Sequence, residues 1–199
     1  MIYTVAAITL LAQQCAPEVA TEAVVPLVVT ESGGDDLSIN VNNGPRVRAR
    51  SVAEGAALVR QYMATGHTVD VGLAQINSAN FARLGVGVEQ VFEPCTNLRL
   101  ASIVLQDGFR LASKHYTGMD AISATYSLYN TGTLTRGFRN GYVSRVWAAA
   151  TDLGSIYAAP AIPGALAAIV KSHTTAVAVP AEDAWIVGQV ASTTVEVFR

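Results

Sequence analysis

The residue whose type and position could do chemistry is Glu31, which lies between an apolar run (residues 23–29) and the pair Gly33-Gly34. A carboxyl group at the end of an apolar segment loses solvent, which disfavours its ionised form and raises its pKa. Such a group can act as a general acid near neutral pH. Taken alone, however, the pattern is more typical of an exposed glutamate in the last turn of a helix that Gly33 ends. A catalytic role for Glu31 therefore depends on the residues that accompany it.

Two later stretches carry groups that suit a polysaccharide ligand: residues 72–77 (GLAQIN) and residues 129–132 (YNTG). A glycosidic oxygen needs a proton donor, and sugar hydroxyl and N-acetyl groups need amides and phenols at fixed positions. Glycines in both stretches would let backbone approach a sugar closely. Taken singly, each of these residues is more typical of an ordinary turn. The side chains that could contact a sugar are Gln75, Asn77, Tyr129 and Asn130.

The helices that must position these residues are marked by caps and apolar stripes. We expect helices over residues 4–14, 21–31, 51–65, 120–129 and 142–153, and a short one ending near residue 85. Asn97 is predicted to cap the longest helix, whose core stripe would include Phe109 and Tyr116. Pro26 should bend the second helix, because it lacks an N–H and its ring clashes with the preceding turn. Residues 38–45 read as a strand entering an Asn-Gly turn, so the fold class is mainly α with a small β-hairpin.

Composition sets limits on the function classes. The chain has 199 residues, of which 51% are hydrophobic and 14% charged, with a formal net charge of −2. Nothing in this balance indicates a nucleic-acid partner. We expect one domain over residues 1–153 and an Ala/Val/Pro/Thr-rich, flexible tail over 154–199. The apolar pieces are too short or too interrupted to span a bilayer, and the apolar start lacks the basic residues of a good signal peptide.

The titratable residues outside these stretches give no metal or cofactor pattern. The three histidines, His67, His115 and His173, lie far apart in the sequence and do not have the spacing of metal ligands. The two cysteines do not have the spacing of a zinc motif either. Cys15 and Cys95 could close a disulfide in an oxidising compartment, or they could be small buried hydrophobes. The residues alone leave both possibilities open.

In their order along the chain, three motifs resemble a known family. Glu-Ser-Gly at 31–33, Gly-Leu-x-Gln-Ile-Asn at 72–77 and Tyr-Asn-x-Gly at 129–132 are similar to the lytic transglycosylases with a goose-type lysozyme fold. Flanking residues 11–17, 66–67, 92–98 and 142–143 are similar to the peptidoglycan-cutting component of type IV secretion and conjugation systems. The resemblance spans Leu10 to Ala150. The chain departs from the family pattern at Ala74, where methionine is common, and at Pro26 in the helix that presents Glu31.

The resemblance implies cleavage of the β-1,4 bond between N-acetylmuramic acid and N-acetylglucosamine in peptidoglycan, with a 1,6-anhydro product. It implies that Glu31 is both acid and base, with Tyr129 a candidate to orient it. It also implies a periplasmic location, glycan strands and type IV secretion components as partners, and no cofactor. An oxidising compartment favours a disulfide between Cys15 and Cys95. The substrate-binding residues carried over by motif position are Ser32, Gln75, Asn77, Tyr129 and Asn130.

Two alternatives remain at this point. If Asp70 faces the groove across from Glu31, it could activate water and make the protein an inverting, lysozyme-type hydrolase. Asp70 in a hairpin is, however, more typical of a solvated or turn-capping aspartate. In the second alternative the protein is a non-enzymatic assembly factor that keeps the groove only to bind glycan.

Overall fold

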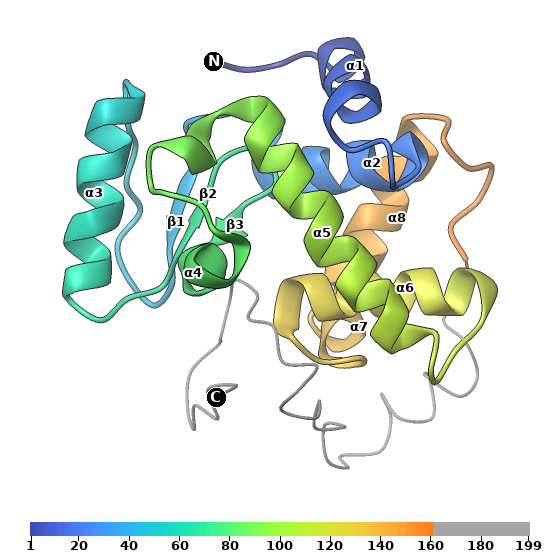
Figure 1. The fold of residues 1–199 in the computed structure, drawn as a ribbon. Coiled ribbons are helices and arrows are strands. Elements are labelled where there is room, and N and C mark those ends of the chain that lie inside the picture. Colours follow the sequence, from blue (N-terminus) through green and yellow to red (C-terminus); the bar gives the residue numbers. More distant parts are fainter. Residues whose placement is uncertain (161–199) are drawn as a thin grey trace.

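A computed structural model of the chain describes residues 1–160. The long helix α5 (Pro94–Ala112) crosses the middle of the molecule, with a small sheet and α3 (Val52–Ala64) to one side of it (Figure 1). The expected tail begins at residue 154, and most of it, residues 161–199, lies outside the described residues. The other helices are α1 (Val5–Cys15), α2 (Thr21–Ser32), α4 (Phe81–Leu84), α6 (Gly118–Thr131), α7 (Arg136–Arg139) and α8 (Tyr142–Asp152), with single 3-10 turns η1 (Ser78–Asn80) and η2 (Gln90–Phe92).

The helical body forms because α2 is apolar on nearly every side. Its residues 24–28 are all buried, and α2 packs against both α1 and α8. Pro26 lies inside this helix, as the sequence predicts, and Gly33 ends it in the left-handed conformation, with φ 62°. The last turn of α2 therefore brings Glu31 from the core to the edge of the body.

The strands form one antiparallel sheet in the order β1-β2-β3, with β1 at Ile39–Val41, β2 at Val69–Val71 and β3 at Ile76–Asn77. The expected hairpin is only part of this arrangement. The Asn-Gly turn does reverse the chain, since Asn40 forms a bridge with Arg46. The main partner of β1 is β2, however, in a register that places Ile39 opposite Val71. An Asn-Gly turn indicates pairing between the segments next to it, and it does not indicate the pairing of β1 with β2, which are far apart in the sequence.

The prediction for the start of α5 was wrong. The helix begins at Pro94, and its N-cap is Glu93, whose carboxylate accepts hydrogen bonds from the N–H groups of Cys95 and Thr96. A proline suits the first turn because its missing N–H would have no helical partner there. Asn97 therefore lies inside the helix, where its side chain is free for other contacts.

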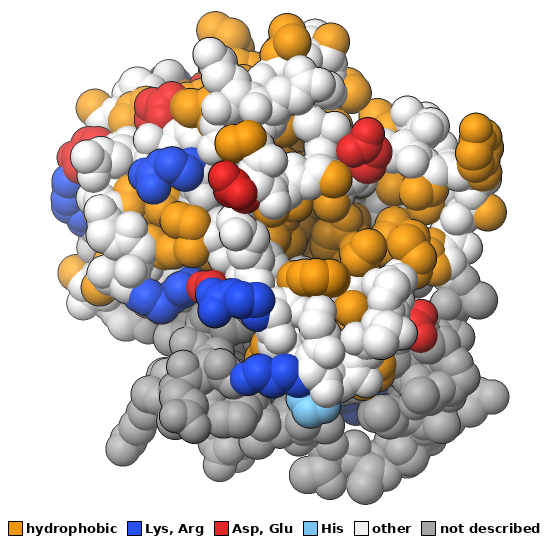
Figure 2. Space-filling view, turned by 45° about the vertical axis from the view of Figure 1, so that its right-hand side comes forward, with side chains coloured by type: hydrophobic (Ala, Val, Ile, Leu, Met, Phe, Trp, Pro, Cys, Tyr) orange, Lys and Arg blue, Asp and Glu red, His pale blue; other side chains and the backbone are white. Residues whose placement is uncertain are grey.

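The predicted core stripe of α5 is also wrong at its end. Phe109 is 46% exposed, and Tyr116 lies beyond the helix, half-buried. Leu98 and Ser102 share the side of α5 on which Phe109 lies, and both are buried. This side is therefore covered along the first turns only. Other large hydrophobic side chains also reach the surface, as Figure 2 shows for one face, and scattered exposure of this kind is usual in globular proteins.

Within residues 1–160, none of the helices combines the length and the apolar character needed to cross a bilayer.

Candidate active site

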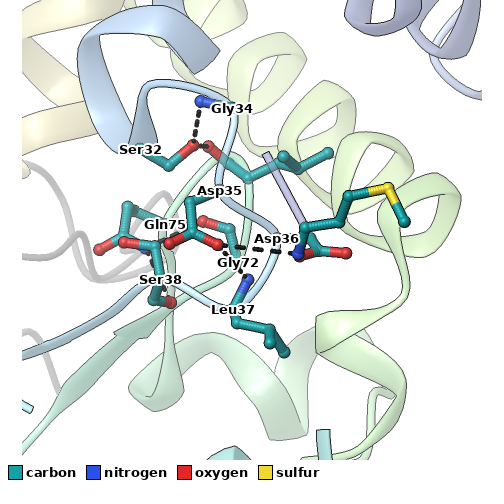
Figure 3. A network of polar contacts seen from close by, with 10 residues as sticks. Ser32, Gly34, Asp35, Asp36, Leu37, Ser38, Gly72 and Gln75 are labelled. Atoms are coloured by element: carbon teal, nitrogen blue, oxygen red, sulfur yellow. Dashed lines mark hydrogen bonds and ion pairs between the residues drawn. The ribbon is translucent and has the colours of Figure 1, made fainter. Parts of the chain in front are cut away.

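The end of α2 is tied to the turn between β2 and β3. The Ser32 hydroxyl donates a hydrogen bond to the Leu73 carbonyl oxygen at 2.7 Å and accepts one from the Gly34 N–H at 3.1 Å (Figure 3). The first bond joins the end of α2 to the β2–β3 turn, and the second holds the chain just after α2, so together they fix the last turn of the helix that carries Glu31. Ser32 is thus engaged with backbone, and it does not line the pocket described next.

A pocket of about 620 Å³ opens beside Glu31, within the range of small-ligand sites. Its wall combines the last turn of α2, the start of the sheet, the end of α6 and the start of α8. Nearly all of its side chains are polar, which suits a hydroxyl-rich ligand better than an apolar one. The lining residues are Thr30, Glu31, Ser38, Ile39, Asn40, Arg46, Val47, Arg48, Asp70, Gln75, Tyr129, Asn130, Tyr142 and Arg145.

Within the pocket, Glu31 has one direct side-chain partner. The phenol of Tyr142 donates a hydrogen bond to Glu31 Oε1. Burial raises the pKa of Glu31 to about 8, the bond from Tyr142 lowers it, and the charge of Asp70 raises it. Burial and the charge of Glu31 also raise the pKa of Tyr142, so its hydroxyl keeps its proton. Near pH 7 Glu31 is therefore mainly protonated and able to donate a proton.

Asp70, the second carboxylate of the pocket, is only 3% exposed. Its Oδ2 accepts hydrogen bonds from the amides of Asn40 at 2.9 Å and Asn42 at 3.1 Å, and its Oδ1 accepts one from Asn77 at 2.6 Å. Burial raises the pKa of Asp70 to about 6, and these three amides limit the rise. Asp70 is therefore mostly ionised at neutral pH, when Glu31 is not.

Gln75 lines the pocket with an unusual backbone, since its φ is 52°. Left-handed backbone in a residue other than glycine costs energy and often occurs at functional sites. Its Nε2 donates hydrogen bonds to the carbonyl oxygens of Gly72 at 2.9 Å and Ser38 at 3.2 Å (Figure 3). Gln75 thereby joins the β2–β3 turn to the segment that leads into β1.

Tyr129 and Asn130, at the end of α6, also line the pocket. The Tyr129 hydroxyl donates to the Ala74 carbonyl oxygen at 2.7 Å, and Asn130 Oδ1 accepts a hydrogen bond from Asn140 at 2.9 Å. The hydroxyl that contacts Glu31 is thus that of Tyr142, and not that of Tyr129.

The structure therefore brings together four of the six residues singled out for catalysis or sugar contact: Glu31, Gln75, Tyr129 and Asn130. Ser32 and Asn77 lie behind the wall. Asn77 bonds to Asp70 and accepts a hydrogen bond from the Ala79 N–H. Through these hydrogen bonds Ser32 and Asn77 stabilise the wall of the pocket.

Sequence reasoning did not find two residues of this region. Tyr142 belongs to the stretch 142–143 that resembles the family, but this resemblance assigns it no role. Asn97, which the sequence predicts to be a helix cap, is fully buried. Its amide donates to the carbonyl oxygens of Val71 and Val91, and its Oδ1 accepts from the Ala74 N–H. A Cβ on Gly72, which has a φ of 81°, would lie 2.3 Å from Asn97 Nδ2. The Gly-Leu-Ala-Gln turn thus depends on a close contact with α5.

The two cysteines are paired, and the described residues offer no metal site. Cys15 at the end of α1 and Cys95 at the start of α5 are joined by a disulfide. Across the described part of the chain, no group of three or more His, Cys, Asp or Glu side chains is arranged to hold a metal ion.

Comparison with known proteins places these features in context. The sequence profile of the transglycosylase SLT domain matches residues 9–146. The chain is 37% identical over 145 residues to protein virB1 of Agrobacterium fabrum, covering 71% of this chain and 58% of the relative. It is 36% identical over 148 residues to type IV secretion system protein virB1 of Brucella abortus biovar 1, covering 70% and 62%. The chain thus spans about three fifths of the length of these curated relatives. No solved structure gives a significant match.

Proposed function

Because the chain belongs to the transglycosylase SLT domain family, we propose that it is a lytic transglycosylase that cleaves peptidoglycan between N-acetylmuramic acid and N-acetylglucosamine. The observation that carries the proposal is the half-buried carboxyl group of Glu31, protonated at neutral pH and held by Tyr142 in a polar pocket. A protein that only binds glycan has no need of such a group. This argues against the non-enzymatic alternative.

In the proposed reaction one carboxyl group acts twice. Glu31 gives its proton to the glycosidic oxygen, and the bond from that oxygen to C1 of the muramoyl residue breaks. The ionised Glu31 then takes the proton of the C6 hydroxyl as its oxygen bonds to C1 and closes the 1,6-anhydro ring. No water enters, and the enzyme ends with its proton restored. Gln75, Tyr129 and Asn130 are proposed to contact the sugar, and Ser32 and Asn77 to hold the elements that carry these residues.

Asp70 favours a second candidate, a hydrolase. It lines the same pocket as Glu31 and is mostly ionised at neutral pH, as a general base must be. Its three amide partners, however, engage both carboxylate oxygens. A base in that position would have to compete with these bonds for a water proton. The transglycosylase is therefore the better supported reaction.

The decisive test is product analysis on isolated peptidoglycan in water enriched in heavy oxygen. A transglycosylase releases anhydro-muropeptides without the label, whereas a hydrolase releases reducing ends that carry it. We expect unlabelled anhydro products, and Glu31→Gln should lower their formation at least about a hundred-fold. Glu22→Gln, at the exposed start of the same helix, is the matched control and should retain activity. Labelled reducing ends that disappear in Asp70→Asn would establish the hydrolase instead.

The biological setting follows from the relatives. Both relatives are named virB1, and the Brucella protein is named as a type IV secretion system protein. We propose that this chain opens the cell wall for such a machine. That role requires a periplasmic location and peptidoglycan strands as the substrate. We also propose that the catalytic domain ends near residue 153, since α8 ends at Asp152 and the composition changes beyond it.

A further inference from the structure

Three arginines line the pocket that contains Glu31. Arg46 and Arg48 belong to the segment between β1 and α3, and Arg145 belongs to α8. All three are exposed. The Arg145 guanidinium lies over the Tyr142 ring, 5.7 Å from its centroid, and donates a hydrogen bond to the Asn140 carbonyl oxygen at 3.3 Å. The cations therefore come from two separate parts of the chain and meet at one cavity.

None of these arginines has an acidic partner within residues 1–160. The arginines of that part of the chain that form ion pairs are Arg60, with Glu89, and Arg83 and Arg110, both with Asp107. Only these three of the ten arginines in the described residues form ion pairs, so the lack of an acidic partner is common in this protein. What distinguishes Arg46, Arg48 and Arg145 is that all three line the same pocket.

The two pocket carboxyl groups do not balance this charge. Burial keeps Glu31 mainly protonated at neutral pH, and the single charge of Asp70 is already engaged by three amides. The pocket therefore has three positive charges against about one negative charge. Guanidinium groups bind carboxylates through paired, charge-assisted hydrogen bonds. A glycan backbone with only hydroxyl and N-acetyl groups offers them hydrogen-bond acceptors but no opposite charge.

We propose that Arg46, Arg48 and Arg145 bind carboxylates of the stem peptides attached to N-acetylmuramic acid, so that the enzyme prefers strands that carry charged peptides. The proposal rests on the proposed function, because it concerns the substrate of the same pocket. The chemistry that fits is a peptide carboxylate next to the scissile disaccharide. The lactyl carboxylate that muramic acid exposes after its peptide has been removed is the other source of the same group.

Three substrates distinguish binding of a stem-peptide carboxylate from binding of the lactyl carboxylate. The first is glycan strands with intact stem peptides, the second is the same strands with their carboxylates converted to carboxamides, and the third is strands stripped of peptide by an amidase. For the full-length protein we expect kcat/KM on the first to exceed that on the other two by about three- to ten-fold, as exposed or partly exposed ion pairs allow. The double variant Arg46→Gln/Arg48→Gln should bring the first-to-second ratio close to one.

The matched control is Arg60→Gln/Arg99→Gln, which removes two exposed arginines that do not line the pocket. It should keep the wild-type ratio. Equal rates of the wild type on intact and amidated strands, or an unchanged ratio in the Arg46/Arg48 variant, would overturn the proposal. Equal rates on intact and stripped strands would assign the arginines to the lactyl carboxylate. If the proposed function itself fails, no anhydro product forms from any substrate, so the two failures are distinguishable.

Discussion

The protonation of Glu31 results from opposing effects on one carboxyl group. Burial and the negative charge of Asp70 favour the neutral acid, while the Tyr142 hydroxyl and the charge of Arg145 favour the carboxylate. Burial is the largest effect, so the pKa lies near 8, above the usual value. A proton donor at neutral pH therefore follows from the position of Glu31 at the edge of the core.

The first prediction at this scale concerns the pH dependence of kcat/KM. The acid must be protonated before substrate binds, so activity should fall as pH rises through about 8. In Tyr142→Phe the bond that stabilises the carboxylate is lost, so the pKa of Glu31 should rise and the alkaline limb should move to higher pH. We also expect activity at pH 7 to fall about ten-fold, because the carboxyl group loses the hydrogen bond that holds it in position.

Tyr126→Phe is the control for this measurement. Its hydroxyl is also buried, but it donates to the Ala23 carbonyl oxygen, and Tyr126 does not line the pocket. Its pH profile should match that of the wild type. An alkaline limb that stays in place in Tyr142→Phe would mean that this bond does not govern the protonation of Glu31.

The comparison of Tyr129 with Tyr142 shows where sequence reasoning stops at this scale. Both are buried tyrosines that line the pocket. Which hydroxyl reaches Glu31 depends on how α6 and α8 pack around the end of α2, and of these two helices α8 makes the more extensive contact with α2. Residue type and spacing single out Glu31 as the candidate acid, through the apolar segment before it and the motifs that follow in the chain. They could not identify its partner, which depends on tertiary packing.

At the scale of elements, the pocket depends on a turn that α5 holds from behind. Asn97 connects three segments through its side chain: the end of β2, the turn after it and the 3-10 turn η2. All three partners are backbone groups in the interior. Replacing Asn97 would leave two carbonyl groups and one N–H without a partner, and each buried polar group left unpaired costs about 1–3 kcal/mol.

We therefore expect Asn97→Ala to lower the free energy of unfolding by about 3 kcal/mol or more, measured by urea denaturation. Gln61→Ala is the matched removal of an amide, at an exposed position of α3, and should change the stability by less than about 0.5 kcal/mol. If both variants were equally stable, Asn97 would not be holding the turn. Any loss of activity in Asn97→Ala at a temperature where it remains folded would then report on the position of Gln75.

Local signals predicted most helices well and the sheet only in part. Thr4, Ser51 and the glycines after α2 and α6 act on the chain next to them, so their effect can be read from a short stretch. The pairing of β1 with β2 joins segments separated by the whole of α3. No short pattern specifies it. For the same reason no short stretch indicates the amide partners of Asp70, which come from β1, from β3 and from the turn beyond β1.

At the scale of the whole molecule, the disulfide between Cys15 and Cys95 encloses much of the proposed site. The closed loop spans a sequence separation of 80 residues and contains Glu31, Asp70 and Gln75, whereas Tyr129 and Tyr142 lie outside it. The disulfide also joins α1 to the start of α5, two helices that pack together. In the unfolded chain the disulfide therefore keeps the segments of α1 and α5 close together, and these two helices are in contact in the folded protein.

Removing this cross-link should destabilise the protein substantially without changing its chemistry. For a loop of this length the chain-entropy estimate is about 4 kcal/mol, so Cys15→Ala/Cys95→Ala should lower the melting temperature by about 10 °C. Reductant should lower the melting temperature of the wild type to a similar value and leave that of the double variant unchanged. Because no pocket side chain is altered, activity per folded molecule should persist at low temperature. A wild type whose melting temperature is insensitive to reductant, with two thiols titrating in the protein isolated from its native compartment, would show that the cross-link does not form there.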